Sequence, residues 1–120
     1  MIDVIKVAKT VKRLINVTDD QTNNLLSTVR SVCVELSNRL KKDEYADDER
    51  AINAAVYLSY YRFILKQIVT GEFPEHFKAG DITVTQSPSL MLEKAAILRD
   101  DAICQASSLL EDLDFIFRQV

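Results

Sequence analysis

Residues 51–69 read AINAAVYLSYYRFILKQIV, and only five of these nineteen side chains are neither apolar nor aromatic. Asp47 or Asp48 is placed to cap the start of a helix here, and Gly71 is placed to end it. A helix that is apolar nearly all round is buried among neighbouring helices or shared with another subunit. The five exceptions are Asn53, Ser59, Arg62, Lys66 and Gln67.

Three tyrosines, Tyr57, Tyr60 and Tyr61, lie close together in this central stretch. Tyrosine combines a large apolar ring with a hydroxyl group, and the residue is enriched where a surface is buried by a partner. We expect all three at an interface between subunits. The alternative is that they are core aromatics whose hydroxyl groups reach the edge of the bundle.

Two amphipathic helices are predicted before the central stretch. In residues 3–15 apolar side chains recur at steps of three and four, which is the period of a helix with one buried face. Thr18 and Gln21 fit a capping box that starts a second helix, and this helix runs to about Lys41. The other face of the first helix is locally basic. Its basic residues are Lys6, Lys9, Lys12 and Arg13.

A last helix is predicted over 88–111, because Ser87 and Pro88 form a typical helix start. Its apolar side is interrupted only by Arg99. The connection 71–88 contains both glycines and both prolines of the chain, and Ile82-Thr83-Val84-Thr85 alternates like a short strand. A connection of this length is commonly functional. We expect it to form a loop or small hairpin that projects from the helices.

The composition supports one all-α domain over residues 1–120. Two glycines and two prolines are too few for a fold built from many tight turns. We predict a four-helix bundle-like domain with a short β element in the loop between the last two helices. No window approaches the length of a membrane span, and the first residues lack the apolar core of a signal peptide. These features favour a protein made in a cytoplasm.

The residues for several kinds of chemistry are missing from the sequence. It contains one histidine, His76, and two distant cysteines, Cys33 and Cys104, which are too few for a structural zinc site. Both cysteines lie in apolar helical patterns, and we expect them to pack as small hydrophobic residues. There is no glycine-rich phosphate loop. We predict a protein that is not an enzyme, with no catalytic residues, no metal and no cofactor.

The segment 77–84, FKAGDITV, and the ending 114–120, DFIFRQV, resemble parts of the small head–tail connector proteins of tailed bacteriophages and prophages. These head-completion adaptors likewise have helical hairpins, a central helix with alanine and tyrosine, and then a stretch like FKAGDITV. The resemblance implies a structural virion protein that forms a ring, commonly of twelve subunits, beneath the portal. Such a ring extends the DNA channel and receives the stopper or tail.

The resemblance implies four partners: other copies of the chain, the portal protein, a stopper or tail-completion protein, and the packaged DNA in the channel. It also implies synthesis in the bacterial cytoplasm, location in the virion neck and no membrane association. Besides the tyrosines, we expect Phe77, Gly80, Ile82 and Val84 at the assembly interface. Leu113, Phe115 and Phe117 alternate along the ending, which we expect to dock on a neighbouring subunit or the portal. The alternative is that the ending folds back on its own bundle.

Two other functions fit the sequence. One is a cytoplasmic helical adaptor or regulator, a monomer or dimer that binds a single protein partner. The other is a small nucleic-acid-binding protein that contacts phosphates through Lys6, Lys9, Lys12 and Arg13. A solvated basic face without any ligand is the simpler interpretation of those four residues.

Overall fold

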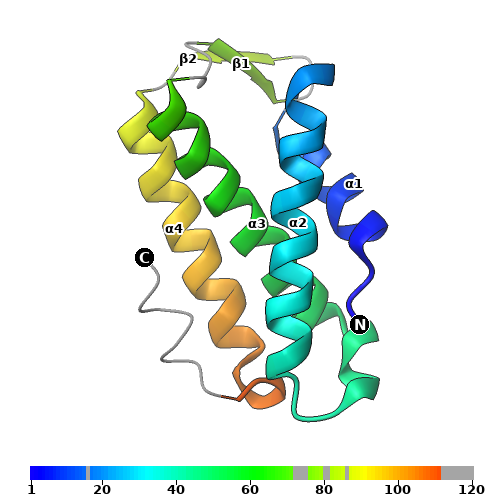
Figure 1. The fold of residues 1–120 in the computed structure, drawn as a ribbon. Coiled ribbons are helices and arrows are strands. Elements are labelled where there is room, and N and C mark those ends of the chain that lie inside the picture. The colour runs from blue at the N-terminus through cyan, green and yellow to red at the C-terminus, as the bar shows by residue number, and fades with distance from the viewer. Residues whose placement is uncertain (16, 72–75, 80–81, 86, 112–120) are drawn as a thin grey trace.

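The computed structural model describes residues 1–15, 17–71, 76–79, 82–85 and 87–111, with the backbone alone described for 76–79 and 82–85. The helices are α1 (Val4–Leu14), α2 (Asp19–Arg39), α3 (Glu49–Thr70) and α4 (Pro88–Gln105), with the short 3-10 helices η1 (Asp43–Asp47) and η2 (Ser107–Leu109). The four long helices form one bundle (Figure 1), which confirms the predicted all-α class. Within the described residues no helix has the length and apolar character needed to cross a membrane.

Helix α3 occupies the centre of the bundle and packs against α1, α2 and α4. Its buried residues are distributed around the whole helix, so it has no single polar face. Phe63 and Ile64, both almost fully buried, are among the largest side chains of the core. The apolar sequence of α3 is therefore accounted for by burial within one chain, and a second subunit is not needed to cover it.

The helix ends follow the signals in the sequence. Thr18 and Gln21 form both hydrogen bonds of the predicted capping box: the Thr18 hydroxyl accepts from the Gln21 amide at 3.3 Å, and Gln21 Oε1 accepts from the Thr18 amide at 3.1 Å. Gly71 ends α3 with a left-handed φ of 75°, a conformation that glycine adopts without strain. Ser87 caps α4, and Pro88 is its first residue.

One end of the bundle is closed by contacts between the end of α2 and the chain that follows α4. Helix α4 ends at Gln105, short of the predicted residue 111, because the chain turns into η2. Leu40 and Leu110 then form an isolated antiparallel bridge. The Glu111 amide donates to the Arg39 carbonyl at 2.7 Å. These backbone bonds hold Leu110 and Glu111 against the end of α2.

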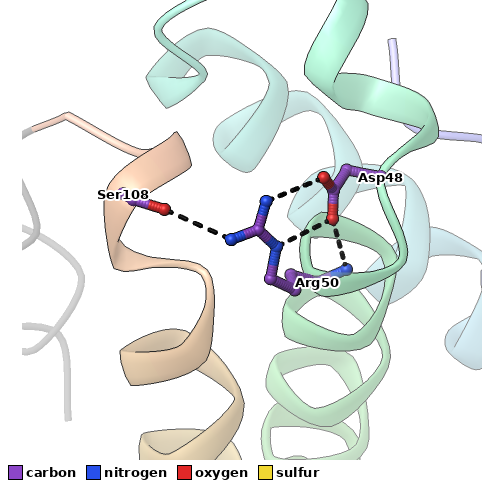
Figure 2. A network of polar contacts seen from close by, with 3 residues as sticks. All are labelled: Asp48, Arg50 and Ser108. Carbon is purple, nitrogen blue, oxygen red and sulfur yellow. Dashed lines mark hydrogen bonds and ion pairs between the residues drawn. The ribbon is translucent and has the colours of Figure 1, made fainter.

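A polar network at the same end joins the start of α3 to η2 (Figure 2). Asp48 Oδ1 caps α3 by accepting from the Arg50 amide at 2.9 Å. The Arg50 guanidinium donates hydrogen bonds to both oxygens of the Asp48 carboxylate, and it also donates to the Ser108 hydroxyl at 3.4 Å. The hydrogen bonds from Arg50 lower the pKa of Asp48. The network is solvent-exposed, so its main effect is to orient the helix end.

Polar contacts between described residues join α2 to α3 at Glu35 and at Gln21. Glu35 forms an ion pair with Arg62, with Nη1 2.6 Å from Oε2 and Nη2 3.3 Å from Oε1. Both side chains are largely shielded from solvent, at 17% and 24% exposed. Further along, Gln21 Nε2 donates to Oε1 of the buried Gln67 at 3.1 Å. Each contact satisfies a polar group on the otherwise apolar surface of α3.

Between α3 and α4 the chain forms two short strands, β1 (His76–Ala79) and β2 (Ile82–Thr85). They pair antiparallel, with Phe77 opposite Val84 and Ala79 opposite Ile82. Figure 1 shows this hairpin across the end of the bundle where α3 ends and α4 begins.

Loss of the Glu35–Arg62 contact is expected to weaken the α2–α3 interface. Because a partly buried guanidinium then loses a bidentate carboxylate, Glu35→Ala should lower the free energy of unfolding by roughly 1–3 kcal/mol. Urea denaturation followed by circular dichroism measures the change. Glu93→Ala is the matched control, since Glu93 is exposed on α4. Equal effects of the two substitutions would contradict this role for the ion pair.

Candidate binding and assembly surfaces

The tyrosine cluster is mostly inside the monomer. Tyr60 and Tyr61 are only 8% and 7% exposed and belong to the hydrophobic core. Burial in the apolar interior raises the pKa of Tyr60. The expectation that these two residues contact another subunit is therefore corrected, because α3 lies at the centre of the bundle. Tyr57 is partly exposed and remains available to a partner.

Arg99 lies on the buried side of α4, as its place in the apolar pattern of the sequence indicated. The buried residues of α4 are Met91, Ala95, Arg99, Ala102 and Ile103, so the arginine belongs to the buried row. The apolar row that the sequence predicted for this helix is shifted by about one residue from the buried row, so its members Leu92 and Ala96 are only partly buried.

The Arg99 guanidinium contacts two residues, Tyr61 and Asp100. Its plane lies over the Tyr61 ring, with Cζ 4.2 Å from the ring centroid, which is a cation–π distance. Nε and Nη2 both contact Asp100 Oδ1, at 2.8 and 2.7 Å. Nη1 is buried and has no hydrogen-bond partner within the part of the chain that the structure describes. The sequence signal for this site was the arginine in an apolar row, next to an acidic residue.

The basic face of α1 is exposed to solvent. Lys6, Lys9, Lys12 and Arg13 are all exposed. Lys12 and Arg13 lie in the last turn of α1, where positive charge suits the helix dipole. Lys6 also borders a shallow groove of about 280 Å³ between α1 and α3. The groove is lined by Lys6, Thr10, Glu49, Ile52, Asn53 and Val56.

The remaining predicted interface residues belong to the hairpin and the chain ending. Phe77 lies in β1, while Ile82 and Val84 lie in β2. Gly80 lies outside the described residues, and so do Phe115 and Phe117 with the rest of the predicted docking segment.

The two cysteines have different surroundings, and both are free thiols. Cys33 is buried as expected, and burial, with a smaller effect from Asp3, raises its pKa from 9.0 to about 11. Cys104 is exposed, which corrects the expectation that it packs as a small hydrophobic residue. It lies on the side of α4 that faces away from the core. Among the described residues, no group of three or more histidine, cysteine, aspartate or glutamate side chains could hold a metal ion.

No family model matches the sequence, and no curated protein or solved structure is significantly similar to it.

The contrast between the thiols predicts selective labelling. At about pH 8 a thiol-specific reagent should modify Cys104 and leave Cys33 intact, because the thiolate is the reactive form. Intact-mass spectrometry should show one modification in the native protein and two after unfolding. Rapid double labelling of the native protein would contradict the burial of Cys33.

The raised pKa of Cys33 also predicts that the free energy of unfolding falls as pH rises from 9 to 11, since the unfolded chain loses the Cys33 thiol proton first.

Proposed function

We propose that this protein is a structural, non-enzymatic connector subunit of the head–tail junction of a tailed bacteriophage. It assembles with other copies into a ring, of about twelve subunits by the resemblance of its sequence. The ring joins the portal protein to a stopper or tail-completion protein and surrounds the DNA channel in the virion neck. The observation that carries the proposal is the segment 77–84, which resembles connector proteins and contributes to the β1–β2 hairpin at one end of the bundle.

The hairpin has a backbone suited to contact between subunits. A two-stranded sheet alone is marginally stable and gains from further strands. Because two residues separate Ala79 from Ile82 in the sequence, Ala79 and Ile82 are expected to form a hydrogen-bonded pair at this end of the ladder. The alternation of the antiparallel ladder then directs the backbone groups of Lys78 and Thr83 away from the partner strand.

Opposite edges of the hairpin offer a route to a ring. When β1 of one subunit pairs with β2 of the next, each subunit uses two different surfaces. Such heterologous contacts close into a ring when the rotation between subunits permits it. This arrangement replaces the central helix as the assembly element, because α3 is already buried within the monomer.

Substitution of Thr83 tests the proposed edge contact. Thr83→Pro removes the outward backbone N–H and should abolish ring formation, while the folded monomer keeps its helicity. Thr83→Val is the matched control, since it retains the N–H, and it should still assemble. Electron microscopy of the chain mixed with its cognate portal protein measures the ring. A portal complex that contains a single copy of the chain, or no ring, would contradict the proposed function.

The exposed basic face of α1 supports a second candidate, a nucleic-acid-binding protein. In that case the isolated chain binds duplex DNA, and the logarithm of the affinity falls linearly with the logarithm of salt concentration. Replacement of Lys9, Lys12 and Arg13 by glutamine should reduce this salt dependence, as measured by fluorescence anisotropy. No binding at low salt would reject this candidate, and a monomeric DNA-binding protein that never forms rings would favour it over the connector.

A further inference from the structure

The outer face of α4, opposite its contact with α3, carries exposed apolar side chains. Leu90 and Ile97 are 40% and 62% exposed, and Leu98 beside Ile97 is 43% exposed. Leu90, Ile97 and the exposed Cys104 follow one another at intervals of seven residues, so the helix places them in one row, with a drift of only about 20° per interval. Exposed apolar side chains that gather on one face indicate a contact surface.

Two opposite charges flank the centre of this outer face symmetrically. Lys94 lies about one turn before the midpoint between Ile97 and Leu98, and Asp101 lies the same distance after it. Both side chains are exposed. Neither has an oppositely charged residue three or four positions away on α4, so neither charge is paired along the helix. The Asp101 carboxylate accepts a hydrogen bond from Gln105 Nε2 at 2.9 Å, which orients it.

We propose that two copies of the chain bind each other through this outer face, with their α4 helices antiparallel about a two-fold axis near Ile97 and Leu98. A two-fold contact uses the same surface on both copies, so a residue before the axis meets the equivalent residue after it. Ile97 and Leu98 of the two copies then cover each other at the centre, and Lys94 of each copy faces Asp101 of the other. A parallel pair would bring like charges together, and their repulsion disfavours it.

The outer face favours a second copy as its occupant because it is complementary to itself. The reversed α4 of a second copy supplies apolar side chains at the centre and the opposite charge on each flank, as a two-fold contact requires. A contact made by one helix of each copy is smaller than a standard interface of about 1,600 Å², so we expect a weak dimer that depends on concentration. The pair closes at two copies, and this inference does not rest on the proposed function.

Sedimentation equilibrium of the full chain tests the pairing. The mean mass should rise with concentration from that of one copy toward that of two. Ile97→Lys places like charges together at the axis and should raise the dissociation constant of the dimer about tenfold or more. Val34→Lys is the matched control, since Val34 is an exposed apolar residue of α2, and it should leave the dissociation constant unchanged. Circular dichroism shows whether both variants keep their helicity.

Two outcomes of the sedimentation experiment would overturn the proposal. One is a chain that stays monomeric at every concentration up to about 1 mM, where even a weak dimer forms. The other is an equal effect of the substitutions at positions 97 and 34, which would show that the outer face of α4 has no special place in the association.

Exchange of the two charges tests the antiparallel direction. Lys94→Asp alone and Asp101→Lys alone each turn the two attractions across the axis into repulsions, so each should weaken the dimer roughly tenfold. The double substitution K94D/D101K reverses both signs and restores both attractions, so its dissociation constant should return close to the wild-type value. Single substitutions without effect, or a double substitution that restores nothing, would overturn the antiparallel pair.

Discussion

Burial of α3 around most of its circumference is the constraint on which the other elements depend. A helix with Phe63 and Ile64 in the core and apolar residues around its circumference is stable only when several helices cover it. Helices α1 and α2 cover one part, and α4 covers another. Two polar residues of α3, the partly buried Arg62 and the buried Gln67, are each matched by a residue of α2, whereas the buried Ser59 hydroxyl has no hydrogen-bond partner among the described residues. At Arg62 and Gln67, packing and hydrogen bonding therefore favour the same arrangement of α2 and α3.

The sequence predicted the features that depend on neighbouring residues along the chain. The capping box at Thr18, the left-handed Gly71 and the Ser87–Pro88 helix start are local, and the structure contains all three. The all-α class also followed, because it depends on the period of the apolar residues and the scarcity of turn residues.

Features that depend on which helices meet were harder to predict. Tyr60 and Tyr61 were expected at an interface because sequence alone does not show that one bundle can surround α3. Arg99 looked like an interruption because its counterion Asp100 and the Tyr61 ring make its burial possible only in three dimensions. Cys104 lies in an apolar pattern, yet the buried row of α4 is rotated away from it. For Cys104, a rotation of α4 by about one residue decides whether the side chain is buried.

The side chain of Gln21 has a consequence for the dynamics of the bundle. Its Oε1 completes the capping box at the start of α2, while its Nε2 holds the buried Gln67 in the last turns of α3. One amide group thus joins two helix ends that are 46 residues apart in sequence. Fraying of either end removes a hydrogen-bond partner from the other, so local opening at one end weakens the other end as well.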